Sequence, residues 1–395
     1  MPEARSDQAS SGRSGGRTVV SRSRDIDDSA TTEVDDERLR VLAVCAVNGH
    51  GGPIQSLGTI VHELRERAIV TLASQRPRLS PTLLDDQTVD LVEIPRPTGR
   101  KFVVAAWRLA RHGRASRSEI DLIHANGLTE AALCLPMAIV SRRPVVVWIH
   151  NFERPGAFRL TEPFLRLSRS LTWIGVSVVA ADQVPWANVE LIQNPIAPAA
   201  PDAADTTRPT RPVIAYAAGT DRPYKGFDLL PDIVEATAQL DADWHVYTAP
   251  PYSSPDERCT AAWDRFLGPL AHSADIRARV ADASSIYRSA SVVVAPSRQE
   301  SFNRVIVEAL AHGVPVVASD IPAHRALAAE CDAVHTFLIN DPSAAAAAIA
   351  DLLGDRDAYR RHQSAARAFA ARFEPDRIAQ QILDAWCRAA NRANR

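Results

Sequence analysis

The 395-residue sequence lacks the long apolar runs that mark membrane spans and secretory leaders. No run approaches the ~20 apolar residues needed to cross a bilayer. Residues 1–36 are rich in Ser, Arg, Asp and Gly, so we expect a disordered tail and no signal peptide. The tail also carries a basic cluster, but acidic residues follow it, which favours a solvated tail over contact with anionic lipid; the cluster is Arg13, Arg17, Arg22 and Arg24.

The sequence also has few cysteines and a small net charge. The five cysteines are scattered and form no C-x-x-C pair, which argues against a disulfide framework and a zinc site; they are Cys45, Cys134, Cys259, Cys331 and Cys387. Cys45 and Cys134 lie in apolar runs and are expected in the core. A net charge of -2 suggests no nucleic-acid partner. We expect a cytoplasmic protein, with peripheral contact at the inner membrane face left open.

What the sequence does contain is a regular alternation of strand and helix patterns from Leu39 onward. The length suggests two domains, and apolar residues at 46% allow a sizeable core. Largely apolar runs are typical of strands buried on both faces of a parallel sheet. The predicted strands are Leu39–Val47, Ala68–Ala73, Val89–Ile94, Asp121–Ala125, Pro144–His150, Leu171–Val176 and Val189–Gln193, and the predicted helices are Ile54–Arg67, Phe102–Arg111, Leu128–Val140 and Phe164–Ser170.

A proline-rich stretch, Asn194–Pro212, interrupts this alternation of strands and helices and has the composition of a linker. The alternation then restarts. The second set of strands is Val213–Ala217, Trp244–Tyr247, Ala290–Ala295 and Pro315–Ala318, and its helices are Asp228–Leu240, Arg304–His312, Ala344–Leu353, Ala358–Phe373 and Asp376–Ala390. We therefore predict an α/β protein of two Rossmann-like, doubly wound domains facing each other across a cleft that holds the site. The predicted divisions are a tail 1–36, an N-terminal domain 37–196, a linker 197–211, a C-terminal domain 212–375 and a final helix 376–395.

In the second domain, two glutamates flank a predicted helix start. Glu300 lies in a short loop after a strand, a helix begins near Asn303, and Glu308 lies within that helix. A helix N-terminus suits a diphosphate, and a carboxylate can accept two hydroxyl hydrogen bonds from a diol. A nucleotide sugar presents a diol, then a diphosphate and then a second diol, which matches a helix start flanked by two carboxylates. On spacing alone, a surface helix with two solvated glutamates is an equally good interpretation.

The segment 296–319 resembles the signature of the retaining GT-B glycosyltransferases of family 4, or group 1. Seven residues separate Glu300 from Glu308, the helix ends at Gly313, and the next strand opens with Pro315-Val316. The resemblance implies that Glu308 binds the ribose hydroxyls and Glu300 the donor sugar. The residues between them complete the implied donor site; they are Ser301, Phe302, Asn303 and Arg304. Asn303 departs from the glycine of the family, although Asn tolerates unusual backbone angles.

A second motif, Gly219–Gly226, places Arg222 and Lys225 in a loop bounded by glycines. Two cations beside a diphosphate would neutralise the charge that develops on the leaving nucleotide. Lys225-Gly226 matches the corresponding loop of the family, whereas Thr220 stands where the family has arginine. An ordinary charged turn is the alternative interpretation of this loop.

The first predicted domain contributes a glycine pair and two histidines. Gly51 and Gly52 follow the first strand and resemble the family loop that faces the donor phosphates. Ile54 breaks a dinucleotide-binding fingerprint, which makes a nicotinamide oxidoreductase the least favoured alternative. His150 matches the family histidine beside donor and acceptor, whereas His124 fits a structural role better. Ser177 and Asn194 also resemble family positions, but Asn194 could simply cap the turn before Pro195.

The resemblance runs from about Leu39 to Ala390 and implies a retaining glycosyltransferase. Such an enzyme moves a sugar from a nucleoside diphosphate donor to an acceptor hydroxyl on a glycan, a lipid-linked molecule or a small molecule. No carboxylate is obviously placed as a covalent nucleophile, so the leaving phosphate is expected to accept the acceptor proton. The final helix has core positions and, by resemblance, crosses back to the first domain.

We expect no metal and no cofactor. The two Asp-x-Asp spacings, at Asp241–Asp243 and Asp355–Asp357, do not follow the ends of strands, so we predict that both are solvated turns. Three alternatives remain: a catalytically weak homologue serving as a binding or scaffold subunit, a sugar-nucleotide epimerase and a phosphorylase. Thr220 and Asn303 are the residues that favour the first of these.

Overall fold

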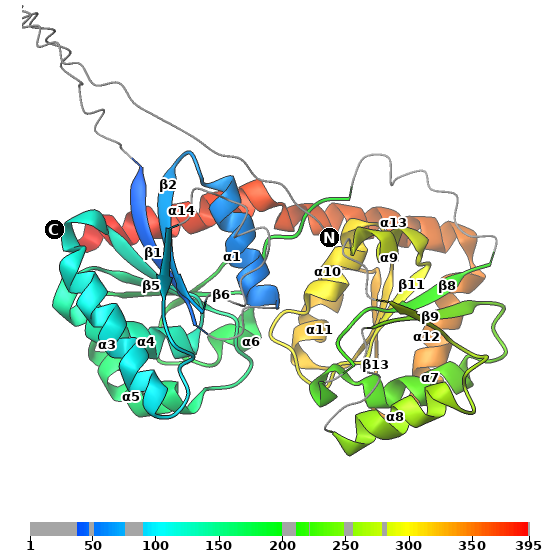
Figure 1. Ribbon diagram of the computed structural model, residues 1–395. Helices are drawn as coiled ribbons and strands as arrows, with labels where there is room; N and C mark the ends of the chain where they lie inside the picture. Colours follow the sequence, from blue (N-terminus) through cyan, green and yellow to red (C-terminus); the bar gives the residue numbers. More distant parts are fainter. Residues whose placement is uncertain are drawn as a thin grey trace, which may run out of the picture. The chain divides into compact units, whose positions relative to one another are not determined.

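The computed structural model describes residues 38–46, 51–75, 90–199, 211–220, 222–248, 256–278 and 283–393. The predicted tail 1–36 lies outside this range, as does most of the predicted linker. The domain boundaries therefore stay predictions. Within the described residues, two parallel sheets succeed each other along the chain (Figure 1).

The first sheet has seven strands in the order β3-β2-β1-β4-β5-β6-β7, all paired in parallel. Its central strands β4 and β5 are buried along their whole length, as their apolar sequences predict. The chain reverses direction across the sheet between β1 and β4, the position where ligands bind in folds of this class. The strands are β1 Leu39–Cys45, β2 Ala68–Ser74, β3 Asp90–Glu93, β4 Leu122–Ala125, β5 Val145–Ile149, β6 Leu171–Gly175 and β7 Val189–Leu191.

The helices that connect these strands are α1 Gly52–Glu63, α3 Arg100–Ala115, α4 Leu128–Ser141, α5 Gly156–Leu167 and α6 Val178–Ala181, with a 3-10 turn at Arg117–Glu119. The prediction for α5 was wrong at its start, because the helix begins at Gly156 and continues through Pro163. Helices α3 and α4 pack closely, since a Cβ on Gly113 would lie 2.4 Å from Met137 Cγ.

The second sheet has six parallel strands in the order β10-β9-β8-β11-β12-β13. The strands are β8 Val213–Tyr216, β9 Asp243–Thr248, β10 Asp275–Ala278, β11 Val292–Ala295, β12 Val316–Ser319 and β13 Val334–Phe337. Its helices are α7 Leu230–Ala236, α8 Glu257–Leu267, α9 Ser284–Ser289, α10 Arg304–Ala311, α11 Pro322–Ala328, α12 Pro342–Gly354 and α13 Arg356–Ala370, with 3-10 turns at Pro223–Lys225, Phe227–Leu229 and Ala371–Phe373. The prediction of two Rossmann-like domains is confirmed.

Several elements of the second sheet were absent from the sequence prediction: β10, β13, α8, α9 and α11. Helix α8 did carry a signal, because its buried residues Cys259, Trp263 and Phe266 recur at helical spacing. The edge strands β10 and β13 are only partly buried, so their sequences lack the apolar runs of central strands.

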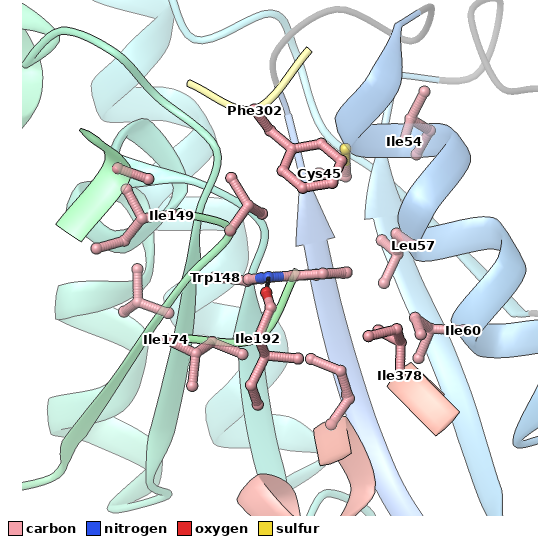
Figure 2. Close-up of a cluster of buried hydrophobic side chains, with 14 of the residues drawn as sticks. Cys45, Ile54, Leu57, Ile60, Trp148, Ile149, Ile174, Ile192, Phe302 and Ile378 are labelled. Carbon is pink, nitrogen blue, oxygen red and sulfur yellow. Dashed lines mark hydrogen bonds between the residues drawn. The ribbon is translucent and has the colours of Figure 1, made fainter. Parts of the chain in front are cut away.

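The final helix α14, Pro375–Ala393, joins the core of the first sheet. Its buried Trp386 donates a hydrogen bond from Nε1 to His124 Nδ1 at 3.1 Å. Figure 2 shows Trp148 at the centre of the same cluster, with Ile378 of α14 and Phe302 nearby; Trp148 Nε1 donates to the Ile192 carbonyl at 3.0 Å. Cys45 and Cys134 are buried, as predicted. Among the described residues, no helix is long and apolar enough to cross a membrane.

Candidate functional site

The structure brings Lys225 and Glu300 together. Each follows one of two neighbouring parallel strands, β8 and β11, so both lie at the same edge of the second sheet. Lys225 Nζ lies 2.6 Å from Glu300 Oε1, and Ser297 Oγ donates to the same oxygen at 3.0 Å. Only 8% of the Glu300 side chain is exposed, so the ammonium compensates a carboxylate that is largely removed from water.

Gly226 allows the Lys225 loop to approach the end of β11. Its φ is +69°, and a Cβ at this position would lie 1.9 Å from the Pro296 carbonyl oxygen. A side chain there would therefore push the loop away. The backbone N–H of Arg298 donates to the Tyr224 carbonyl at 2.7 Å and also holds the two segments together.

The other members of this loop take different positions. Arg222 is exposed, and its Nη1 donates to the Tyr224 hydroxyl at 2.9 Å. Thr220 is buried, and its hydroxyl lies 2.8 Å from the Thr248 hydroxyl. Of the two predicted cations, it is Lys225 that contacts the predicted donor-sugar carboxylate, while Arg222 lies at the outer end of the loop.

Asn303 adopts a left-handed backbone conformation, which glycine takes without strain. Its φ is +64° and ψ +81°, in the left-handed region, at the N-cap of α10. Its side chain does not cap the helix; Nδ2 instead lies 2.9 Å from Nε2 of the buried His324. His324 Nδ1 donates to the Ser319 carbonyl at 2.8 Å, so Nε2 is the unprotonated nitrogen that accepts from Asn303. The side chain therefore leaves the first-turn N–H groups of α10 uncapped.

We predict that Asn303→Ala destabilises the chain more than Asn303→Gly. Both variants lose the hydrogen bond to His324, but only alanine places a Cβ in the left-handed region, at a cost of about 1–2 kcal/mol. Urea unfolding of both variants would measure the difference. An alanine variant as stable as the glycine variant would contradict the assignment of a left-handed conformation to this residue.

Ser301 ties the Glu300 segment to the first sheet. Its Oγ donates to the His150 carbonyl at 2.8 Å, just beyond the end of β5. Its own carbonyl accepts a hydrogen bond from Ser177 Oγ, which follows β6 and also caps α6. The loop between Glu300 and α10 is thus anchored at the carboxyl ends of two strands of the other sheet.

Glu308 has a partner at each oxygen. The Tyr287 hydroxyl donates to Oε2 at 2.9 Å, and Arg304 Nη2 lies 3.2 Å from Oε1. Burial and the neighbouring Glu308 carboxylate raise the pKa of Tyr287 well above its usual range, so the phenol remains a donor. The Glu308 side chain is 22% exposed and can still accept hydrogen bonds from a ligand.

Arg304 links this carboxylate to the first helix of the chain. Its Nη1 donates to Ser56 Oγ at 2.9 Å and to the Pro195 carbonyl at 3.0 Å. Ser56 Oγ in turn donates to Asn194 Oδ1 at 2.8 Å, so Asn194 belongs to this network. A Cβ on Gly52 would lie 2.9 Å from Arg304 Cδ, which places this member of the predicted glycine pair against the same side chain.

Sequence reasoning missed Ser56 and Tyr287. Ser56 carried a usable signal, because it is a polar residue among the buried apolar positions of α1. No pattern around Tyr287 distinguished it from an ordinary core aromatic. Gly51, the other predicted glycine, has φ +138° and forms the N-cap of α1, a conformation that favours glycine.

The two histidines differ in their surroundings. His150 Nε2 lies 3.1 Å from Asn126 Oδ1, and its ring is 4.5 Å from that of Trp148. Burial, then the nearby His124 and Arg304, lower the pKa of His150 to about 3, so it is neutral at pH 7. His124 is fully buried between Trp148 and Trp386, and burial lowers its pKa to about 4. These contacts favour a packing role for His124.

The Asp-x-Asp spacings have local partners. Asp241 and Asp243 both bind Arg211, at 2.8 and 2.6 Å, and Asp355 caps α13 by accepting from Asp357 and Ala358 N–H. In the described part of the chain, no three His, Cys, Asp or Glu side chains gather as metal ligands would.

Residues 211–355 match the family described as "Glycosyl transferases group 1", and this range contains Lys225, Glu300 and Glu308. This match agrees with the resemblance that the motifs predict for the second half of the chain. A D-inositol 3-phosphate glycosyltransferase of Xylanimonas cellulosilytica is 36% identical over 138 residues, 32% of this chain and 33% of that protein. A phosphatidyl-myo-inositol mannosyltransferase of Mycobacterium tuberculosis is 33% identical over 174 residues, 41% and 43% of the two chains. The aligned regions cover between 23% and 43% of the length of the curated relatives.

Solved structures of similar fold cover nearly the whole chain. HepE of Anabaena, in complex with UDP and glucose, superimposes with a TM-score of 0.72 at 19% identity, over 88% of this chain and 99% of that one. Sucrose-phosphate synthase of Thermosynechococcus elongatus gives a TM-score of 0.68 at 17% identity, over 89% and 99%. Both likenesses concern the fold, and they agree with the predicted GT-B architecture.

Proposed function

We propose that this chain is a glycosyltransferase that moves a sugar from a nucleoside diphosphate donor to an acceptor hydroxyl with retention at the anomeric carbon. The observation that carries the proposal is the Lys225–Glu300 pair beside the start of α10, with Glu308 one turn into that helix. These residues lie within the part of the chain that matches the group 1 family.

The proposed roles follow from charge and hydrogen-bonding capacity. The ammonium of Lys225 and the uncapped N–H groups of α10 suit the diphosphate, whose negative charge rises as it departs. Glu308 is assigned the ribose hydroxyls and Glu300 the hydroxyls of the donor sugar. Arg222 adds positive charge at the outer end of the loop. His150, being neutral, is assigned a hydrogen bond and no charge.

In the proposed reaction, the bond between the anomeric carbon and the diphosphate oxygen breaks. The acceptor oxygen bonds to that carbon on the same face, and its proton passes to the departing phosphate. Glu300 is held by Lys225 and Ser297, an arrangement that favours binding of hydroxyls over attack at carbon. No metal is assigned a part in these steps.

For the acceptor, the relatives provide the first candidates. Their names specify D-inositol 3-phosphate and phosphatidyl-myo-inositol. We propose a polyol, free or lipid-linked, as the first class to test. Product analysis with and without such an acceptor also separates a transferase from a sugar-nucleotide epimerase, which needs none.

A thermal-shift screen against UDP-, GDP- and dTDP-sugars tests the donor assignment. A ligand at 100 times its Kd stabilises the native state by about 2.7 kcal/mol, which corresponds to a shift in Tm of ~3–6 °C. The matching free sugars and inorganic pyrophosphate are the controls. Absence of binding to every nucleoside diphosphate, confirmed by calorimetry, would contradict the proposal and favour the scaffold alternative.

A further inference from the structure

The outer surface of α3 is unusual for a helix that covers a sheet. Its solvent side exposes three large apolar side chains, Val103, Val104 and Trp107, and Trp107 is 59% exposed. The helix has basic residues and no acidic ones; they are Arg100, Lys101, Arg108, Arg111 and Arg114. The Arg111 guanidinium lies 5.8 Å from the centre of the Trp107 ring. Apolar and basic side chains thus share one exposed face.

Helix α5 repeats the pattern. Leu160, Phe164 and Leu167 follow one another at i, i+4 and i+7, and each is exposed by more than 60%. Arg159 and Arg166 lie beside them. The acidic residue of this helix, Glu162, is only 13% exposed and is bound by Arg154, Arg166 and the Trp186 indole. Its charge offsets that of Arg166, so α3, which has no acidic residue, is the main source of positive charge on this surface.

These helices lie on the same face of the first sheet. They connect β3 to β4 and β5 to β6, which run in the same direction across the sheet, and such connections share one hand. Helix α4 lies with them, as Figure 1 shows, and adds exposed Ile139 and Val140. Most of the large apolar side chains that the described residues expose are on these three helices.

Packing of the domain does not require these side chains, because they point away from the sheet into solvent. A second copy of the chain is a poor occupant, since a symmetric contact would place the same basic helices opposite each other. An anionic bilayer surface fits both features. Basic side chains gain from its negative potential, and a Trp with neighbouring aliphatic residues suits the headgroup boundary.

We propose that α3, α5 and the end of α4 form a docking surface for anionic phospholipid, here called the α3–α5 face. It is formed by Val103, Val104, Trp107, Ile139, Val140, Leu160, Phe164 and Leu167 with the basic residues beside them. The face goes beyond the proposed function and does not depend on it. It begins near the predicted site, since α5 starts six residues after His150.

Flotation of the full chain with vesicles tests the apolar part. One vesicle is equimolar phosphatidylglycerol and phosphatidylcholine, and the other is phosphatidylcholine alone. The double variant Trp107→Glu/Phe164→Glu is expected to reduce binding to the anionic vesicle by at least ~20-fold, because it removes apolar area and adds negative charge. Its matched control is Leu267→Glu/Leu338→Glu, whose residues are equally exposed, at 59% and 63%, and lie in the other half of the chain. The control is expected to bind as the parent does.

A second pair of variants tests the charge. Arg108→Gln and Arg111→Gln are each expected to weaken binding about fivefold, and binding should fall with added salt. Arg360→Gln and Arg361→Gln on α13 are the controls. All variants keep the basic cluster of the tail, Arg13, Arg17, Arg22 and Arg24. A thermal melt of each variant shows whether it is folded.

Three results would overturn the proposal. The first is unchanged vesicle binding by folded α3–α5 face variants. The second is loss of binding only when the four arginines of the tail are replaced by Gln, which would make the tail the contact. The third is a dimer in sedimentation that Trp107→Glu/Phe164→Glu dissociates, because a second copy would then occupy the face.

Discussion

Lys225→Ala is expected to lower kcat by about 10²–10³, the loss typical of removing one preorganised group that stabilises developing negative charge. In the folded chain the Lys225 ammonium lies against Glu300 at the end of β11, where the predicted diphosphate would depart. Donor binding should weaken less than kcat, since charge on the diphosphate is greatest in the transition state. Steady-state kinetics with the donor found in the thermal screen would separate the two effects.

A control is needed because Lys225→Ala also leaves the Glu300 carboxylate without its cation. Glu300→Gln in the same background removes that unpaired charge, and the double variant should recover stability without recovering turnover. Arg372→Ala is the matched surface change, since Arg372 forms an exposed ion pair with Glu330 at 2.6 Å. It is expected to leave kcat unchanged. An unchanged rate in Lys225→Ala would count against the diphosphate role.

Glu308→Ala is expected to remove most activity and to weaken nucleotide binding by ~10- to 150-fold. The estimate corresponds to the loss of hydrogen bonds to a charged acceptor, about 1.5–3 kcal/mol. The change also deprives Arg304 and the Tyr287 hydroxyl of a partner, so a moderate loss of stability should accompany it. Calorimetry with the free nucleoside diphosphate measures binding, and urea unfolding measures stability.

Glu308→Gln keeps the shape and one acceptor oxygen while removing the charge. It should therefore retain more stability than alanine while still losing affinity. Glu330→Ala, at the other end of the exposed ion pair with Arg372, is the matched control and should bind nucleotide as the parent does. Near-normal turnover in Glu308→Ala would remove Glu308 from the site.

Local patterns predicted the strands and helices well where burial is complete and less well at the edges. Continuous apolar runs predict the buried strands β4 and β5. Helix α5 was placed too late because Pro163 lies inside it, and proline more often begins a helix than continues one. Edge strands β10 and β13 were missed because partial burial needs no apolar run.

The sequence by itself determined that the Glu300–Glu308 segment is a loop and a helix start with two carboxylates, directly after a strand, because spacing and turn chemistry are local properties. The family resemblance implied that Asn303 stands in place of glycine; the structure added that Asn303 takes a left-handed conformation and that its amide binds His324. Only the tertiary structure decided which cation contacts Glu300, and that Arg304 connects Glu308 to Ser56 and Pro195. These partners lie between about 75 and 250 residues apart in the chain, and no local pattern reports a contact that forms only once the chain has folded.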